Sequence, residues 1–304
     1  MGPHIFADLH NHTRASDGDL SPAEMVGRAH DLGIGYLGIT DHDTLGGLGA
    51  ALAAGDALGV EIIPGVEVSV RFQTPRFTGT LHLLCYFKRG ELENGAFVHD
   101  FSNLLSRGRG ATLVRARVAR INQIFGPKGS EPIMARDLTL EDFSDYGENL
   151  SRRHFALALE EKLGIGDSRI RRQIIANQSP AYVPSGIDLA ELAPFLAAHP
   201  ILPVLAHPAA GSFPGEGHYK EVLPPFDIVV ALLPLFLAAG LRGVEVHYPG
   251  HTLELEAELT RMAARHGLLI TGGSDCHGDG ARPPGVAGMD RGEFELFMAA
   301  FNQL

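Results

Sequence analysis

Cysteine and tryptophan are nearly missing from this sequence of 304 residues, which contains two cysteines and no tryptophan. Cys85 and Cys276 are too few for the disulfide framework of a small secreted protein, so a reducing cytoplasm is the simplest location. No segment approaches the about 18 consecutive apolar residues of a membrane-spanning helix. The first residues also lack the basic and apolar regions of a secretion signal. We therefore expect a cytoplasmic protein that makes no contact with a membrane.

An excess of positive charge is also absent. The sequence has 25 lysine and arginine residues against 36 acidic residues, which gives a formal net charge of -11. A protein that binds duplex DNA without sequence preference needs a basic surface, so we expect no duplex DNA partner. A small phosphorylated substrate is not excluded, because bound divalent ions can make a site positive whatever the outer surface carries.

What the sequence does contain is an alternation of short apolar strands and helices. Ser21, Pro22 and Glu24 predict a helix start, with Ser21 as the N-cap and Glu24 completing a capping box. The predicted strands span residues 5–9, 36–40, 61–70, 81–87, 201–206, 243–247 and 268–273, and the predicted helices span residues 22–33, 48–58, 188–199, 252–267 and 291–304. Alternation with short connections is typical of an α/β protein with a parallel sheet or barrel.

This alternation stops between about residues 93 and 194, where the sequence is mostly helical in pattern and rich in arginine. We interpret residues 93–194 as an inserted helical subdomain, which leaves residues 1–92 and 195–304 to form the barrel. Residues 211–226 contain glycine and proline and are predicted to form a loop over the mouth of that barrel.

Six of the 15 histidines end or interrupt these apolar runs, each near a carboxylate or another histidine. Side chains at positions i and i+2 share one side of an extended chain, so His10 with His12, and Asp275 with His277, can each approach one ion. Imidazoles and carboxylates at strand ends are what a metal-dependent hydrolase needs. The candidate ligands are His10, His12, Asp17, His42, Glu67, His82, His207, Asp275 and His277.

Several of these residues have structural explanations when they are considered singly. Asp17 lies in a Ser-Asp-Gly sequence and could equally be a turn residue. Glu67 lies between two valines, where a buried carboxylate is either bound to metal or held in an ion pair, and we favour metal. His82 alone would be a hydrogen-bonded core histidine. Their joint occurrence, in strand order, favours a metal site.

The order of these motifs resembles that of the PHP (polymerase and histidinol phosphatase) metallophosphoesterases. The motifs are Asp-Leu-His-x-His-Thr, Ser-Asp-Gly, Ile-Thr-Asp-His-Asp, Gly-Val-Glu, Leu-His, Ala-His-Pro and Gly-Ser-Asp-x-His, and the resemblance covers nearly the whole chain. It implies a distorted (β/α)7 TIM-like barrel with an inserted helical subdomain. It also implies two or three divalent metal ions, and mixed imidazole and carboxylate ligands suit Mn, Fe or Zn better than Ca or Mg.

The resemblance further implies how the ligands are shared. His10, His12, Glu67 and Asp275 surround one ion, Glu67 bridges to a second ion held by His82 and His207, and Asp17, His42 and His277 hold a third. In this scheme Glu67, Asp275 and His207 are the catalytic residues, and a metal-bridging hydroxide attacks phosphorus. The group that protonates the leaving oxygen is unassigned. His247 and His218 are guesses for it, and both are more often ordinary loop histidines.

The segment Leu150-Ser-Arg-Arg-His-Phe-Ala156 resembles a small-molecule branch of the family, in which an Arg-x-His pair binds phosphate. The pair corresponds to Arg152 and His154, although Arg153 departs from the smaller residue or proline common between them. Arg117 is a further candidate, for which a solvated helix face is the simpler explanation. The implied reaction is hydrolysis of the 3'-phosphate of 3',5'-bisphosphonucleosides such as pAp, with AMP as the product.

Four alternatives remain open at this point. Short 5'-phosphorylated RNA, degraded from its 5' end, and histidinol phosphate are alternative substrates for the same site. A noncatalytic metal module, of the kind attached to some polymerases, is a third possibility, although no polymerase body is present in this sequence. Hydrolysis of a C–N bond is the fourth, and the arginines of the insertion argue against it.

Overall fold

The computed structural model describes residues 5–146, 150–214, 223–278 and 280–304. In this part of the chain the strands form one eight-stranded sheet in the order β1-β2-β3-β4-β6-β7-β8, with β5 paired to β3 outside that path. The strands are β1 (Ala7–Asp8), β2 (Tyr36–Ile39), β3 (Glu61–Gln73), β4 (Thr78–Phe87), β5 (Ile187–Asp188), β6 (Ile201–Leu205), β7 (Gly243–His247) and β8 (Leu269–Gly272). The predicted strand regions are therefore confirmed, with β5 as an addition.

The two ends of this path meet beyond β1 and β8. The amide of Leu9 donates to the carbonyl of Gly272 at 3.1 Å, and the amide of Asp275 donates to the carbonyl of His10 at 2.8 Å. These bonds bring the first and last strands side by side, so the sheet is a nearly closed barrel of seven strands. The predicted mixed α/β barrel is confirmed.

Strand direction differs from the prediction at β4, which runs antiparallel to both β3 and β6. The cause is local: only residues 74–77 separate β3 from β4, and Thr74 and Phe77 close that turn with reciprocal backbone hydrogen bonds of 2.9 and 3.2 Å. Such a short link cannot join parallel strands. Because β4 runs backwards, its first half, which includes His82, lies at the edge where the parallel strands end.

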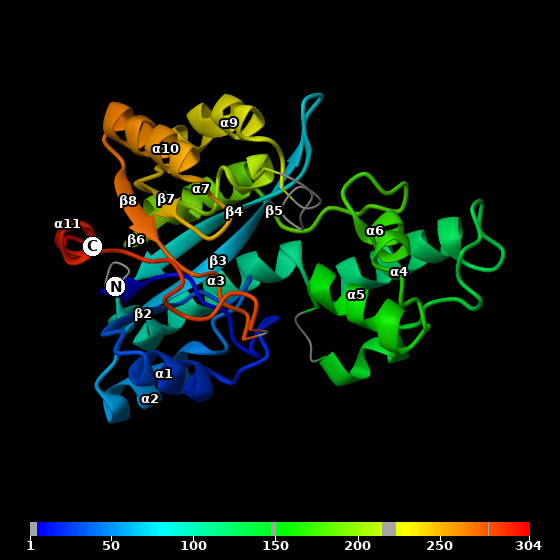
Figure 1. The fold of residues 1–304 in the computed structure, drawn as a ribbon, viewed down its shortest axis with the longest axis horizontal. Helices are drawn as coiled ribbons and strands as arrows, with labels where there is room; N and C mark the ends of the chain where they lie inside the picture. Colours follow the sequence, from blue (N-terminus) through cyan, green and yellow to red (C-terminus); the bar gives the residue numbers. More distant parts are fainter. Residues whose placement is uncertain (1–4, 147–149, 215–222, 279) are drawn as a thin grey trace.

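Helices cover the outside of the barrel (Figure 1). They are α1 (Pro22–Asp31), α2 (Leu48–Leu58), α3 (Gly95–Gly108), α7 (Leu189–Ala198), α9 (Phe226–Ala238) and α10 (Leu253–His266), of which α9 was not predicted. The predicted capping box of α1 is present, with Glu24 accepting from the amide of Ser21 at 2.7 Å. None of the described helices is long and apolar enough to cross a membrane.

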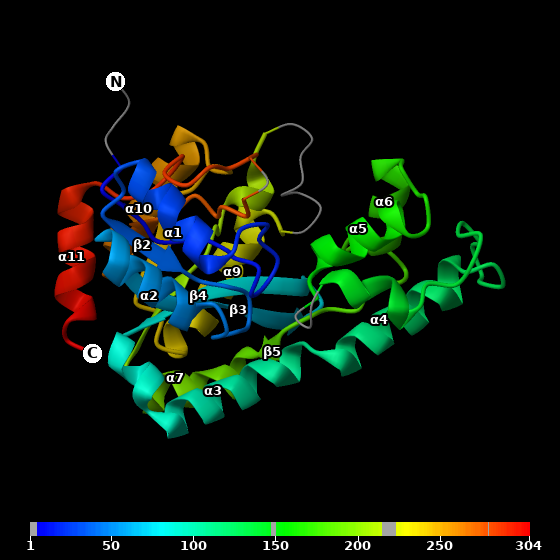
Figure 2. The ribbon, with the colours of Figure 1, turned by 90° about the horizontal axis from the view of Figure 1, so that it is seen from below.

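One end of the barrel is closed by α11 (Arg291–Phe301), which lies opposite the insertion in both Figure 1 and Figure 2. Its Phe294 and Phe297 contact Tyr36 and Tyr86, with ring centroids 4.3 and 5.3 Å apart. Tyr36 begins β2, so α11 covers the end at which the parallel strands start. The other end, where the candidate ligands lie, faces the insertion.

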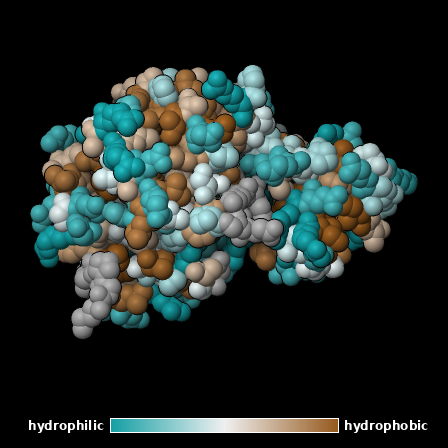
Figure 3. Space-filling view, turned by 45° about the horizontal axis from the view of Figure 1, so that its top comes forward, coloured by the Kyte–Doolittle hydropathy of each residue, from teal (hydrophilic) through white to brown (hydrophobic). Residues whose placement is uncertain are grey.

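The insertion is helical, as its sequence predicts, and has a hydrophobic core of its own. Its helices are α4 (Ala111–Phe125), α5 (Arg152–Glu161) and α6 (Ser168–Ile175), with the 3-10 helix η2 (Leu140–Tyr146). Phe125, Phe143 and Phe155 form part of that core, whereas Phe97 and Phe101 of α3 pack in the barrel core. Figure 3 shows the insertion as a smaller lobe beside the barrel. The boundaries at residues 93 and 194 stay a prediction.

The predicted loop over the barrel mouth is described only in part, because residues 215–222 lie outside the described residues. Before these residues in the sequence lies a 3-10 turn, η3 (Ala210–Ser212). After them, α9 begins at Phe226.

Candidate metal centre

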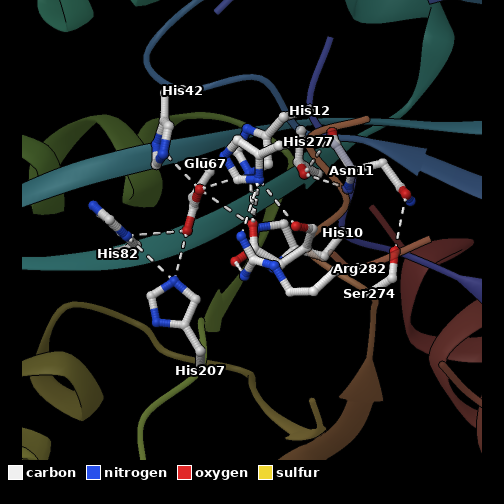
Figure 4. A network of polar contacts seen from close by, with 12 residues as sticks. His10, Asn11, His12, His42, Glu67, His82, His207, Ser274, His277 and Arg282 are labelled. Carbon is white, nitrogen blue, oxygen red and sulfur yellow. Dashed lines mark hydrogen bonds and ion pairs between the residues drawn. The ribbon is translucent and has the colours of Figure 1, made fainter. Parts of the chain in front are cut away.

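All nine predicted ligands converge at the barrel end that faces the insertion, and Figure 4 labels seven of them, without Asp17 and Asp275. His10, His12 and Asp17 follow β1, and His42 follows β2. Glu67 and His82 lie within β3 and β4, His207 follows β6, and Asp275 and His277 follow β8. Eight of the nine residues are buried; His82 is only partly so. Residues from six strands therefore meet in one compact cluster.

A first group of ligand atoms consists of His10 Nε2, His12 Nε2, Glu67 Oε2 and Asp275 Oδ1. His10 Nε2 lies 3.1 Å from His12 Nε2 and 3.3 Å from Glu67 Oε2. His12 Nε2 lies 3.1 Å from both Glu67 Oε2 and Asp275 Oδ1. Atoms that share one ion at about 2.1 Å are about 3.0–3.4 Å apart, so this group has the spacing of a ligand set.

A second group uses the other oxygen of Glu67. Glu67 Oε1 lies 3.1 Å from His82 Nδ1 and 2.9 Å from His207 Nε2, and these two nitrogens are 3.3 Å apart. Glu67 thus presents one oxygen to each of two adjacent groups. This is the arrangement expected of a carboxylate that bridges two ions.

The third group contains Asp17, His42, His277 and His12. Asp17 Oδ1 lies 3.4 Å from His277 Nε2 and 3.8 Å from His12 Nδ1. His42 Nδ1 also lies 3.1 Å from Glu67 Oε2, so this imidazole stands between the third group and the other two. The implied assignment of His42 to the third ion is one of two that its position allows.

Two buried oxygens in the cluster indicate a missing positive charge. Glu67 Oε2 has three imidazole nitrogens within 3.3 Å, yet neither it nor Asp17 Oδ1 accepts a hydrogen bond from any described residue. A buried carboxylate oxygen without a donor is costly. The residues therefore fit divalent cations, and imidazole with carboxylate favours Mn²⁺, Fe²⁺ or Zn²⁺.

The cluster also keeps its carboxylates ionised. Burial raises the pKa of Glu67, but the charges of His42, His82 and His10 outweigh this effect and hold the pKa well below its usual value. The pKa of Asp275 is lowered in the same manner against burial, by Arg282 and His10. Ionised carboxylates are the form that binds metal ions.

Several residues that organise the centre were not predicted. Asp41 accepts from the amide and hydroxyl of Thr13, both at 2.7 Å, and from Ser16 Oγ at 2.6 Å, and so fixes the loop before Asp17. Asp275 Oδ2 accepts from Tyr248 Oη at 2.8 Å and pairs with Arg282. Asp41 does have a sequence signal, because it follows an apolar strand together with two further ionisable residues, which are costly to bury without partners. No such signal marks Tyr248 or Arg282.

Glu245 was also missed, although a signal for it exists. It lies between two valines in β7, which is the pattern that singled out Glu67 in β3. Its side chain is fully buried and contacts His10 Nδ1 at 3.0 Å. The criterion applied to Glu67 would have found it.

The insertion reaches the metal centre through the first turn of α5. Arg153 donates to the carbonyl oxygen of Asp17 at 2.7 Å and forms a bidentate pair with Asp19, with both contacts at 2.9 Å. The neighbouring His154 accepts from the amide of Ser151 at 3.0 Å. Arg153, which departs from the family pattern, thus ties the insertion to the Asp17 loop.

These contacts of Arg153 lead to a prediction. Arg153→Ala should weaken the binding of one ion by about tenfold, because the loop that carries Asp17 loses its hydrogen bonds to the insertion. Equilibrium dialysis with Mn²⁺ would measure affinity and stoichiometry. Arg71→Ala is the matched control, since Arg71 forms a similar pair with Asp188 at 2.9 Å. An equal change in Mn²⁺ affinity in both variants would show that the contacts of Arg153 do not support the metal centre.

Arg117 and Arg152 lie together in a small pocket of the insertion, lined also by Phe155 and Tyr182. Arg117 Nε donates to the carbonyl of Val183 at 3.1 Å, and the Arg152 guanidinium lies 5.5 Å from the Tyr182 ring centroid. Burial and the charge of Arg152 lower the pKa of Arg117 to about 9. Arg117 is half-buried and lines this pocket, so its side chain does not lie on a fully solvated helix face.

The two guesses for a general acid receive no support. His247 Nε2 lies 2.9 Å from Glu293 of α11, and its Nδ1 lies 3.7 Å from Glu256 of α10. Its side chain therefore sits between two outer helices, away from the cluster. His218 lies outside the described residues.

Comparison with known proteins identifies the family. A PHP domain model matches residues 8–130. The 3',5'-nucleoside bisphosphate phosphatase of Chromobacterium violaceum is 30% identical over 95% of this chain and 91% of its own length. The chain belongs to the PHP family. It is a metal-dependent phosphoesterase of that family.

Other proteins are similar to this phosphoesterase over most of its length. Phosphoribosyl 1,2-cyclic phosphate 1,2-diphosphodiesterase of Eggerthella lenta is 30% identical over 93% of the chain and 98% of its own length. A 5'-3' exoribonuclease of Haemophilus influenzae is 26% identical over 89% of each chain. A crystal structure from Bifidobacterium adolescentis, described as a metal-dependent phosphoesterase, superimposes with a TM-score of 0.75 at 26% identity and covers 98% of this chain and 97% of its own. The similar proteins act on different phosphate esters, so the substrate has to be argued from the site.

Proposed function

We propose that this phosphoesterase removes the 3'-phosphate from 3',5'-bisphosphonucleosides such as pAp, giving AMP and phosphate. The observation that carries the proposal is a second cationic site: Arg117 and Arg152 share a pocket in the insertion, next to the helix end that contacts the Asp17 loop. A bisphosphorylated substrate needs two anion sites, one for the phosphate that is cut and one for the phosphate that is held. The name of the Chromobacterium violaceum relative supports the same choice.

In the proposed mechanism the nine clustered residues would hold two or three divalent ions, which would supply charge stabilisation for phosphoryl oxygens and lower the pKa of water. Glu67 would be shared between two of the ion sites, because its oxygens belong to different groups. His207 completes the second group from β6. Asp275 directs Oδ1 toward His12, while Tyr248 and Arg282 hold its Oδ2.

The insertion would bind the phosphate that is not cut. A guanidinium can donate two parallel hydrogen bonds to phosphate, which fixes orientation as well as affinity. Arg152 and Arg117 are suited to this role, because two positive groups lie close together in one pocket, where Arg117 Nε donates to the backbone carbonyl of Val183. His154, buried in the first turn of the same helix, is the third proposed contact.

Phosphate release from pAp and from histidinol phosphate, compared on the Mn²⁺-loaded protein, tests this proposal. We expect kcat/KM for pAp to exceed that for histidinol phosphate by at least about tenfold, because one charge-assisted contact to a second phosphate is worth that much. Equal or inverted preference for the two substrates would rule out the nucleotide assignment while leaving the phosphoesterase class intact.

A second candidate function is 5'-3' degradation of short 5'-phosphorylated RNA. It is favoured by the similarity to the Haemophilus influenzae exoribonuclease over 89% of the chain. The same anion pocket would then hold the 5'-phosphate of the RNA. Adding a 5'-phosphorylated tetranucleotide and its 5'-hydroxyl counterpart to the same assay separates the candidates. Faster release of mononucleotides than of phosphate from pAp would favour RNA.

A further inference from the structure

Glu245 is a fully buried carboxylate at the centre of β7 that the proposed mechanism does not use. Its Oε1 lies 3.0 Å from His10 Nδ1, and its Oε2 accepts from the backbone amide of His207 at 2.8 Å. His10 is its ion-pair partner among the described residues. A carboxylate without water is costly to bury, so each of its two contacts has to compensate for that cost.

The first contact determines which nitrogen of His10 carries a proton. A neutral imidazole has one N–H donor and one lone pair. A carboxylate facing Nδ1 holds the proton there, which leaves the lone pair on Nε2. That nitrogen lies 3.1 Å from His12 Nε2 and 3.3 Å from Glu67 Oε2, within the first group of ligand atoms. Glu245 therefore favours the tautomer that can bind an ion.

The second contact holds the backbone of His207, a residue of the second group. The φ angle of His207 is 33°, in the left-handed region that residues with side chains rarely adopt. The hydrogen bond from its amide to Glu245 Oε2 stabilises that conformation. The conformation places Nε2 of His207 2.9 Å from Glu67 Oε1.

We propose that Glu245 is a positioning residue that fixes the tautomer of His10 and the backbone of His207, and so aligns two adjacent ion sites at once. This inference rests on the proposed metal-ligand roles of both histidines. Glu245 is not a member of the three groups of ligand atoms among the described residues. Its effect reaches the reaction through the two histidines.

Glu245→Gln tests the inference, because glutamine keeps the shape but has only one accepting oxygen. If that oxygen accepts from His207, the amide NH2 faces His10 Nδ1 and moves the proton of His10 to Nε2. If the amide is reversed, its NH2 meets the His207 N–H, donor against donor. Either orientation weakens metal binding, and we expect the affinity for Zn²⁺ to fall by about 10–100-fold.

Competition with a chromophoric chelator measures that affinity, and Glu293→Gln is the matched control. Glu293 also pairs with a histidine, His247, but outside the metal centre, so its variant should bind Zn²⁺ normally. Glu67→Gln separates the two proposals. If it retains full metal, the proposed ligand set is wrong. If it loses metal while Glu245→Gln retains it, only the role of Glu245 is wrong.

A measurement on the unaltered protein tests the proposed tautomer of His10 even if Glu245→Gln fails to fold. In the Zn²⁺-loaded protein, ¹⁵N NMR of the imidazoles should show His10 with its proton on Nδ1 and zinc on Nε2. The spectrum of a His10→Gln variant assigns the signal. A proton on Nε2 of His10 would overturn the inference.

Discussion

Glu67→Gln is expected to abolish turnover and to lower the bound metal together. Glu67 gives Oε2 to the first group and Oε1 to the second, so one substitution removes the negative charge shared by two ion sites. The amide that replaces it offers one oxygen and one NH2 group, and the latter cannot bind a cation. Turnover should fall by more than the about 10²–10³-fold lost when a single stabilising donor is removed. Metal analysis and phosphate release on the same preparation measure both effects.

Glu61→Gln is the control for this prediction, since Glu61 is an exposed residue at the start of the same strand. It should leave metal content and turnover unchanged. Full metal loading with nearly normal turnover in Glu67→Gln would show that Glu67 does not bridge two ions. Loss of metal in both variants would instead point to damage to β3.

Local signals in the sequence were sufficient to predict most helices and strands and the set of candidate metal ligands. Ser21 and Glu24 form the capping box of α1, and Gly59, whose φ of 74° is in the left-handed region, caps the C-terminal end of α2. His10 and His12 are two residues apart on an extended segment, so their side chains share one side, as the distance between their Nε2 atoms shows. These patterns depend on neighbours in sequence, which a sequence displays directly.

The features that were missed depend on contacts between distant segments. The direction of β4 is set by its pairing with β3 and β6, and alternation of strands and helices elsewhere suggested parallel pairing throughout. His247 ends a strand like the clustered histidines do, but the register of β7 shifts between Glu245 and His247. In a regular strand residues two apart face the same side. The irregularity lets Glu245 face the cluster while His247 faces α10 and α11.

Arg152→Ala is the second substitution with a large expected effect, on KM for pAp. The Arg152 guanidinium lies over Tyr182 and donates to Asn177 Oδ1 at 2.5 Å, which orients it in the pocket beside Arg117. A hydrogen bond to a charged group is worth about 1.5–3 kcal/mol, which corresponds to an increase in KM of about 10–100-fold. The KM for a simple phosphomonoester should hardly change, because that substrate has no second phosphate.

Arg169→Ala is the control in the same lobe. The Arg169 side chain is 85% exposed on α6 and pairs only loosely with Asp167, at 3.5 Å, so its loss should not alter KM for either substrate. The comparison of two substrates matters more than either value alone. If Arg152→Ala raised KM equally for pAp and for the monoester, the pocket would be supporting the shape of the insertion. If KM were unchanged for both, the second phosphate would have to be bound elsewhere, and the substrate assignment would lose its main structural argument.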